Sequence, residues 1–233
     1  MTPFTAFILR FRVVTLLCLS LALQRSVFSD DSGSELNDVT PIEDNYLGKG
    51  DYEVTMVRTE NPPTIDGILD DESWSTAPVI SNFTQVQPVE GSPPSEKTEV
   101  LLLYSSDYIY VGIRAFDSQP DNITARSMQR DGSMRFDDSV RMTFDTFHDF
   151  RNGYYFEINA LGALRDALIR SGKDPNYNWD GIWDGRAVMD ENGWSAELVI
   201  PTKTLSFDLQ GKNWGFNVER SIQRKRERVR WSA

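Results

Sequence analysis

Oxygen-bearing side chains occur at every second position between residues 174 and 180. They belong to Asp174, Asn176, Asn178 and Asp180. A Ca²⁺ ion takes about six to eight oxygen ligands, and this spacing lets a loop curl all of these side chains inward. Asx side chains are also common in loops that only hydrogen-bond their own backbone. The segment therefore predicts either a calcium site or an Asx-rich loop, although the glycine and glutamate of an EF-hand are missing from the matching positions.

A second polar set comes from two strand-like segments, 140–144 and 154–158. Apolar and polar residues alternate in both. Arg141 in the first segment and Glu157 with Asn159 in the second are therefore expected on the sheet face turned away from the core. Charged and amide side chains in one row suit bidentate binding of hydroxyl groups. A solvated sheet face without a ligand is the alternative.

Residues for catalysis are sparse. His148 is the single histidine, no nucleophile-elbow motif is present, and one cysteine cannot complete a zinc site. A glycosidase needs two carboxylates about 5–10 Å apart, one of them with a raised pKa. Because the chain holds 35 acidic residues, some pair will meet that distance by chance. The residues favour a non-catalytic protein, and the hydrolase alternative stays open.

The charge balance narrows the class of partner. Lys and Arg number 24 against 35 Asp and Glu, which gives a net charge of −11. Such an acidic surface repels nucleic acid and anionic lipid, so neutral glycans or cations such as Ca²⁺ are the better partners. The segment 219–230 is the basic exception. We predict an edge strand there with its charges facing solvent, and a nucleic-acid arm is the alternative.

Residues 1–29 are predicted to be a secretory signal peptide. Arg10 and Arg12 precede an apolar run, 13–23, and small residues follow near a cleavage site at 27–29. The run is shorter than the roughly 20 residues that a membrane span requires. We therefore expect an exported protein that is periplasmic, outer-membrane-associated or secreted, and an uncleaved anchor is the alternative.

The remainder divides into a linker and one domain. Residues 30–50 are rich in Asp, Glu, Ser, Asn and Gly, which is typical of a flexible linker. Residues 51–233 are long enough for one buried core. The only cysteine, Cys18, lies inside the predicted signal, so the folded part has no disulfide. We expect this domain to be a monomer.

Short strands are the elements that must position the polar side chains. Hairpins are predicted where 100–104 meets 108–115 and where 140–144 meets 154–158, the latter around an Asn-Gly turn. No long segment shows the 3.6-residue period of a helix. The fold class is therefore all-β, an antiparallel β-sandwich of the jelly-roll or immunoglobulin-like kind. Further strands are predicted at 54–58, 164–169, 185–189, 194–200 and 214–220.

Four segments together resemble the family 9 carbohydrate-binding modules. They are Thr64–Trp74 with its Asp-Gly turn and acidic loop, Asp138-Ser-Val, Trp183, and Gly193–Pro201. The resemblance covers about residues 53–231. It implies a β-sandwich that binds oligo- or polysaccharide and is linked to polysaccharide breakdown through attached hydrolases. In this family the tryptophan at the place of Trp74 looks structural, closing one end of the sandwich.

The resemblance also marks site residues. Asn159 matches a sugar-contacting position, and Arg141 falls on a charged sugar contact with the sign reversed. Arg135 stands where similar modules carry a tryptophan that clamps a terminal sugar. Trp179 is predicted to be the exposed aromatic of its loop. The candidate carbohydrate-binding residues are therefore Arg135, Arg141, Glu157, Asn159 and Trp179.

The sequence is also similar to exported bacterial proteins that carry this module ahead of an outer-membrane β-barrel. A barrel downstream is therefore a further expected partner. The resemblance leads to three hypotheses: a non-catalytic glycan-binding domain, a structural or interaction domain that docks a partner without binding sugar, and a hydrolase.

Overall fold

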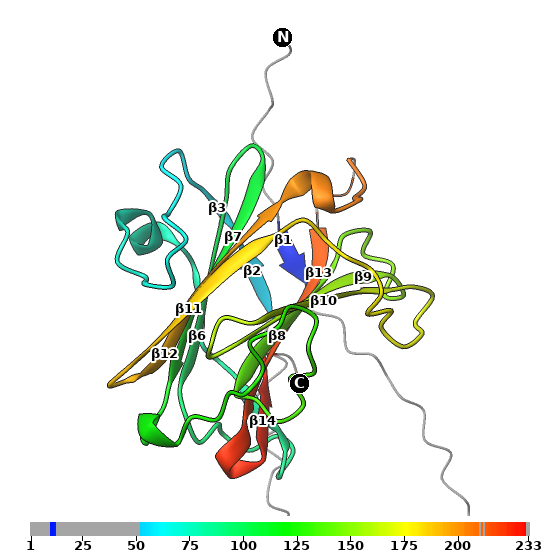
Figure 1. Cartoon of the computed structure of the whole chain (residues 1–233). Coiled ribbons are helices and arrows are strands. Elements are labelled where there is room, and N and C mark those ends of the chain that lie inside the picture. The colour runs from blue at the N-terminus through cyan, green and yellow to red at the C-terminus, as the bar shows by residue number, and fades with distance from the viewer. Residues whose placement is uncertain (1–9, 13–51, 210, 212, 232–233) are drawn as a thin grey trace, which may run out of the picture.

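The computed structural model describes residues 10–12, 52–209, 211 and 213–231, which form a sandwich of two twisted β-sheets (Figure 1). This confirms the predicted all-β class. The strands of the first sheet, sheet A, are β1 (Arg10–Arg12), β2 (Glu53–Thr55), β5 (Thr84–Gln87), β8 (Ser139–Asp145), β9 (Gly153–Asn159), β10 (Leu164–Ile169), β13 (Asn213–Ile222) and β14 (Glu227–Arg230). Their order is β10-β9-β8-β13-β1-β2, and β14 pairs with both β13 and β5.

Sheet B has the order β11-β12-β7-β6-β3, with β4 paired to β6. Its strands are β3 (Val57–Arg58), β4 (Val79–Ile80), β6 (Thr98–Tyr104), β7 (Tyr108–Phe116), β11 (Asp184–Asp190) and β12 (Gly193–Pro201). The connections contain the short 3₁₀ helices η1 (Glu72–Thr76), η2 (Pro120–Asn122), η3 (Thr202–Thr204) and η4 (Gln223–Lys225). None of the helices in the described part of the chain is long and apolar enough to cross a membrane.

The predicted hairpins are confirmed, but the second one does not turn at Asn152-Gly153, because Gly153 already begins β9 and the left-handed residues of the connection are His148 and Phe150. β6 pairs with β7, and β8 pairs with β9 so that Met142 lies opposite Phe156. Both of these side chains point into the core, because residues of one parity face inward along each strand. The predicted single strand at 54–58 instead divides, since β2 pairs in sheet A and β3 in sheet B.

The core fills the space between the two sheets. Val140, Met142 and Phe144 from sheet A pack in one buried cluster with residues of sheet B such as Val111 and Leu198. The ring centroids of Phe144 and Phe156 lie 6.0 Å apart in an edge-on arrangement that aromatic pairs favour. The predicted domain contains no cysteine, so it is stabilised by this packing and not by disulfides, as the sequence predicted.

β1 comes from the range predicted to be a cleaved signal peptide. Its backbone pairs in parallel with β13 and antiparallel with β2. The rest of the predicted signal and the predicted linker lie outside the described residues. Cleavage of the range 1–29 stays a prediction.

The segment 64–80 runs over the outer face of sheet B and ends in β4, which pairs with β6 within that sheet. Trp74 is buried there against Leu103 and its neighbours, in a second apolar cluster. A Cβ atom at position 112 would lie 2.5 Å from a methyl carbon of Leu69 and 3.2 Å from the Trp74 ring. Gly112 therefore leaves the space that Leu69 and the tryptophan ring occupy against the sheet.

A buried carboxylate fastens this segment. Trp74 Nε1 donates to Glu197 Oε1 over 2.7 Å, and the backbone N–H groups of Asp66 and Gly67 each donate to Oε2 over 2.9 Å. Glu197 thus joins the two motifs at 64–74 and 193–201 that were recognised separately in the sequence. Trp74 has a structural role, as expected, but it lies on the outer face of sheet B and does not close one end of the sandwich.

The prediction that the basic residues of 219–230 all face solvent is wrong for Arg220. Its side chain is 0% exposed and lies between the sheets. The guanidinium donates to the carbonyl oxygens of Lys97 (3.0 Å) and Phe116 (2.8 Å) and lies 3.9 Å from the Asp117 carboxylate. An arginine tolerates burial only when such partners replace water. Nor is β14 an edge strand, because β13 and β5 flank it.

Candidate functional site

A groove runs across the outer face of sheet A, on the opposite side of the sandwich from the segment 64–80. Its volume is about 570 Å³, within the range of about 300–1,000 Å³ that is typical of ligand pockets. Outward side chains of β8, β9 and β13 form the floor. The turns at 150–153 and 172–173 form one wall, and Glu90 with Arg230 forms the other.

The floor is centred on a shared carboxylate. Arg141 lies opposite Glu219 on paired strands and donates to its Oε1 atom. Arg230 donates from Nε (3.1 Å) and from a terminal nitrogen (2.9 Å) to the other carboxylate oxygen, and Arg228 approaches to 3.4 Å. Each guanidinium carries five N–H donors, so donors remain for a ligand. The predicted place of Arg141 on this face is confirmed.

β9 supplies Tyr155 to the floor and Glu157 beneath it. They lie opposite Thr143 and Arg141, in the register that the alternation predicted. Tyr155 Oη donates to Glu157 over 2.7 Å, and Ser139 Oγ donates to the same carboxylate over 2.9 Å. Burial, with the adjacent Glu157 charge, raises the pKa of Tyr155 far above its usual range, so the phenol stays protonated. Glu157 is itself buried and orients the phenol rather than lining the groove.

One wall of the groove carries an exposed aromatic that the sequence interpretation missed. Phe150 is 45% exposed and lines the groove. Its backbone φ is +59°, and that of His148 is +53°. Asp145, at the end of β8, accepts the N–H groups of Phe150 (2.7 Å) and Asp149 (3.2 Å). Two phenylalanines, Phe147 and Phe150, in the otherwise polar connection between β8 and β9 were the signal that could have identified it.

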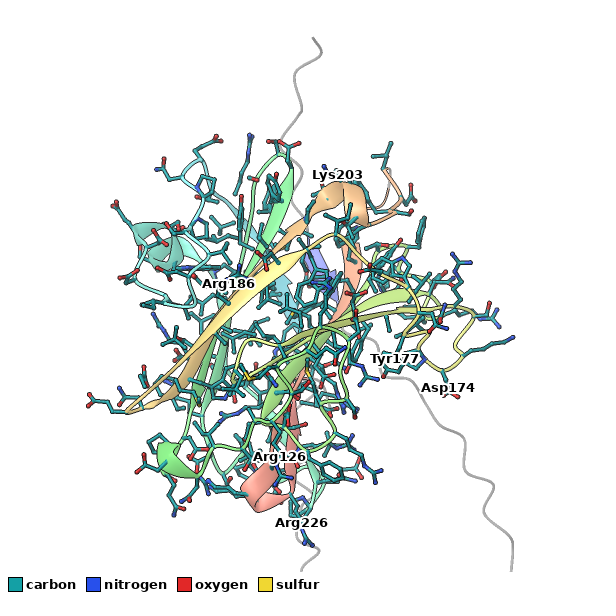
Figure 2. The ribbon with its side chains drawn as sticks, viewed as in Figure 1. Arg126, Asp174, Tyr177, Arg186, Lys203 and Arg226 are labelled. Atoms are coloured by element: carbon teal, nitrogen blue, oxygen red, sulfur yellow. The ribbon has the colours of Figure 1, made fainter. Side chains whose placement is uncertain are left out.

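A second turn lies beside the first and extends this wall. The N–H of Gly172 donates to the carbonyl oxygen of Arg151 over 2.7 Å, and the N–H of Ser171 donates to Asn152 Oδ1 over 3.0 Å. Tyr177, in the loop that follows, is also exposed. Figure 2 shows Tyr177 and Asp174 together on this side of the molecule.

Asn159 does not reach the groove, which corrects its predicted role as a sugar contact. The side chain is 0% exposed. Its Nδ2 donates to the Asp137 carboxylate (2.7 Å) and to the Ser127 carbonyl oxygen (2.8 Å), while Oδ1 accepts the N–H groups of Leu161 (3.1 Å) and Ala163 (2.8 Å). Alternation set the direction of this side chain correctly, but the loop before β8 folds over it.

We expect Asn159→Ala to destabilise the protein by about 3 kcal/mol, because several buried groups lose their hydrogen-bond partners. Urea denaturation followed by tryptophan fluorescence measures the loss. The control is Asn122→Ala, since the Asn122 amide makes one exposed bond of 3.1 Å to Gln119. A destabilisation by Asn159→Ala no larger than that of the control would contradict the anchoring role.

Two other predicted sugar contacts also lie outside the groove lining. Trp179 was predicted to be exposed, but it is half-buried, with its ring centroid 5.3 Å from that of the core residue Tyr154. Tyr177 is the exposed aromatic of that loop instead. Arg135 is exposed in the loop before β8, where its guanidinium lies 5.3 Å from the Phe136 ring centroid.

The four predicted calcium ligands lie along one exposed loop. Asn176 Oδ1 accepts the N–H of Asn178 over 3.1 Å, which is an Asx turn, and Asp180 lies 3.8 Å from Arg130. Asp174 is exposed. Within the described residues, no group of three or more His, Cys, Asp or Glu side chains is placed to hold a metal ion. Calcium binding by the mixed Asp and Asn set stays a prediction.

Burial raises the pKa of three carboxyl groups, Asp138, Asp166 and Glu197. All three are almost completely inaccessible. Each accepts hydrogen bonds that hold a loop, as when Asp166 accepts from Trp183 Nε1 (2.7 Å) and from the N–H of Gly181 (3.0 Å). A raised pKa is expected of a general acid, but these groups cannot reach a ligand in the groove.

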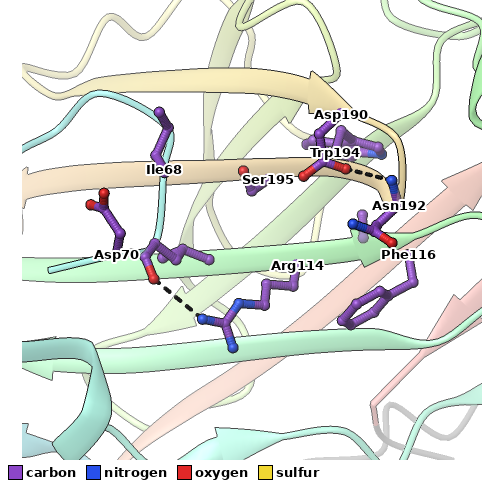
Figure 3. Close-up of a pocket in the computed structure, with 10 residues that line it drawn as sticks. Ile68, Asp70, Arg114, Phe116, Asp190, Asn192, Trp194 and Ser195 are labelled. Atoms are coloured by element: carbon purple, nitrogen blue, oxygen red, sulfur yellow. Dashed lines mark hydrogen bonds between the residues drawn. The ribbon is translucent and has the colours of Figure 1, made fainter. Parts of the chain in front are cut away.

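A second cavity, of about 390 Å³, lies on the outer face of sheet B (Figure 3). Arg114 donates to the Leu69 carbonyl oxygen over 3.3 Å, and the N–H of Asn192 donates to Asp190 over 2.7 Å. These polar groups hold the covering segment and the β11–β12 turn. The groove on sheet A is therefore the better candidate for a ligand.

Known structures share this fold. A carbohydrate-binding module of family 9 from Caldicellulosiruptor kristjanssonii, solved with cellotriose, matches with a TM-score of 0.52 and 14% identity over 76% of this chain and 82% of that one. A structure of such a module from the same organism with glucose matches with a TM-score of 0.55 and 14% identity over 75% and 85% of the two chains. At this identity the likeness shows the fold.

Sequence comparison identifies the family. No curated protein matches the chain. The profile of the family described as "Carbohydrate family 9 binding domain-like" matches residues 65–232, which include the whole groove floor. Because this match spans most of the sequence, the chain belongs to the carbohydrate family 9 binding domain-like family.

Proposed function

We propose that the protein is a non-catalytic carbohydrate-binding domain whose ligand lies in the groove of sheet A. The observation that carries the proposal is the groove itself, which is open on one sheet face and combines an exposed aromatic with fixed hydrogen-bond donors. Phe150 offers a flat apolar surface at the wall, and Arg141 and Tyr155 offer polar groups at the floor. Family membership supports the same class of ligand.

The chemistry fits sugar binding. A pyranose has an apolar C–H face and a rim of hydroxyl groups, so it suits an aromatic wall beside guanidinium donors. The carboxylates at the floor are already engaged, Glu219 by arginines and Asp145 by backbone N–H groups. They are therefore arranged to hold the site together rather than to transfer protons.

We further propose that this domain acts outside the cytoplasm, in polysaccharide breakdown. The basic start and short apolar run of residues 1–29 support export, and the link to breakdown rests on the family resemblance. A loop of alternating Asp and Asn supports calcium as an accessory ion.

The test removes the aromatic wall. Phe150→Asn should lower affinity for the bound oligosaccharide at least about tenfold, because it deletes a large apolar contact. The fold should tolerate the change, since asparagine readily adopts the φ of +59° found at this residue. Titration calorimetry of the full chain with a panel of neutral and acidic oligosaccharides measures the effect.

Phe147→Asn is the matched control. Phe147 lies in the same turn and is 47% exposed, but it does not line the groove. Its replacement should leave affinity unchanged. An equal loss of affinity in the two variants would contradict the proposed place of the ligand. No binding heat with any oligosaccharide would contradict the proposed function and favour an interaction domain that binds no sugar.

A further inference from the structure

We infer that the groove selects acidic saccharides, whose carboxylate or sulfate group lies between Arg151 and Lys173. This inference rests on the proposed function and names the class of sugar. Overall composition points the other way, because the chain carries a net charge of −11. The local arrangement of charges in the groove differs from that average.

The lining contains four cationic side chains, Arg141, Arg151, Lys173 and Arg230, and three anionic ones, Glu90, Asp145 and Glu219. Two of the three acids are already compensated. Glu219 interacts with three arginines, and Asp145 accepts two backbone N–H groups of the turn that follows it. The charge left for a ligand to meet is therefore positive.

Arg151 and Lys173 carry the positive charge that the acids of the lining do not compensate. Neither side chain forms an ion pair with a carboxylate of the described residues. Asp149, which interacts electrostatically with Arg151, accepts the backbone N–H groups of Arg151 and Asn152. Both are exposed. They lie on adjoining turns, which the hydrogen bond from the Gly172 N–H to the Arg151 carbonyl oxygen holds together at 2.7 Å. Two cations on one wall form a site for a single anionic group.

The aromatic wall places this charge next to the sugar ring. Phe150 immediately precedes Arg151, and both line the groove. A ring stacked on Phe150 would thus carry its acidic substituent within reach of the basic turns. Charge-assisted hydrogen bonds to a carboxylate are stronger than those to a neutral hydroxyl group, so charge should decide between otherwise similar ligands.

The experiment compares ligands that differ only in charge. The full chain is titrated with trigalacturonate and with its methyl ester, which keeps the same sugar backbone without the charge. Trimannuronate and a sulfated galactan oligomer distinguish a uronate from a sulfate ester, and cellotriose is the neutral reference. We expect at least one acidic oligomer to bind about tenfold more tightly than its uncharged counterpart.

Charge removal in the protein gives the reciprocal test. The double variant Arg151→Gln and Lys173→Gln should lower affinity for the acidic oligomer about tenfold or more, should lower affinity for cellotriose by a smaller factor, and should leave the melting temperature unchanged. The matched control is Arg186→Gln with Lys203→Gln. It removes the same charge from two exposed cations that lie apart from the Tyr177 side of the molecule (Figure 2).

The outcomes separate the two proposals. Equal affinity for the acid and its ester, or an equal effect of the two double variants, overturns the charge inference while sugar binding stands. Absence of binding to every oligosaccharide, neutral or acidic, overturns the proposed function and the charge inference with it.

Discussion

Replacing Glu197 with alanine is expected to lower the free energy of unfolding by about 3–5 kcal/mol. The carboxylate is the acceptor for Trp74 Nε1 and for the N–H groups of Asp66 and Gly67. Each buried donor that loses its acceptor keeps its desolvation cost without compensation. Trp74 should then become more exposed, and urea denaturation followed by tryptophan fluorescence would report both changes.

Glu99→Ala is the control for this variant. Glu99 lies on the same outer sheet face but pairs with the exposed Lys97 (2.6 Å) and the half-buried Arg114 (3.6 Å). Surface ion pairs of this kind contribute up to about 1 kcal/mol. If Glu197→Ala lowers the free energy of unfolding no more than Glu99→Ala does, the Glu197 carboxylate does not hold the segment 64–80 on the sheet.

Arg220→Ala is expected to destabilise the protein by about 3–5 kcal/mol, because it leaves a cavity and removes the donor of the carbonyl oxygens of Lys97 and Phe116. Asp117 keeps Arg224 as a partner at 2.5 Å. Burial lowers the pKa of Arg220 to about 10, so its guanidinium is still charged at neutral pH. Arg220→Lys should give an intermediate loss, because one ammonium group cannot reproduce the planar fork that reaches both Lys97 and Phe116. Thermal and urea unfolding measure the series.

Arg58→Ala is the control for the arginine series. Arg58 is exposed and pairs with Glu60 at 3.4 Å, so its removal should cost less than about 1 kcal/mol. A loss of that size for Arg220→Ala would show that the buried guanidinium contributes no more than a surface one.

The strands and their pairing could be predicted because both depend on local pattern. Alternation of apolar residues places Met142 and Phe156 inward and sets the β8–β9 register. The predicted Asn-Gly turn was wrong, because Gly153 already lies in β9 and the left-handed residues of the connection are His148 and Phe150. The same alternation put Arg141 and Glu157 correctly on one face. Order within each sheet depends on longer connections, which short-range spacing does not encode.

Whether a side chain is buried by a loop could not be predicted, because the loop that covers it lies far away in the sequence. Asn159 leaves the sheet in the expected direction but meets Ser127, 32 residues away, and Asp137, 22 residues away. Arg220 likewise finds its acceptors more than a hundred residues away. Alternation predicts the sheet face on which a side chain lies, but its burial depends on the whole fold.

Composition was also an incomplete guide to the partner. The net charge of −11 averages over the whole chain, whereas a ligand responds mainly to the charges within about 10 Å, the distance beyond which salt screens exposed charges. Arg151 and Lys173 become neighbours only because two turns hydrogen-bond to each other. Nothing in the spacing of these residues distinguishes them from cations scattered over a surface.

The bonds from the turn to Asp145 affect how a ligand would associate. The carboxylate holds the backbone of Phe150 in its left-handed conformation from within the protein, so the aromatic wall is in place before a sugar arrives. A preorganised wall loses little conformational entropy on association. Affinity would then depend on the contacts themselves, and differences between ligands should be found mainly in their dissociation rates.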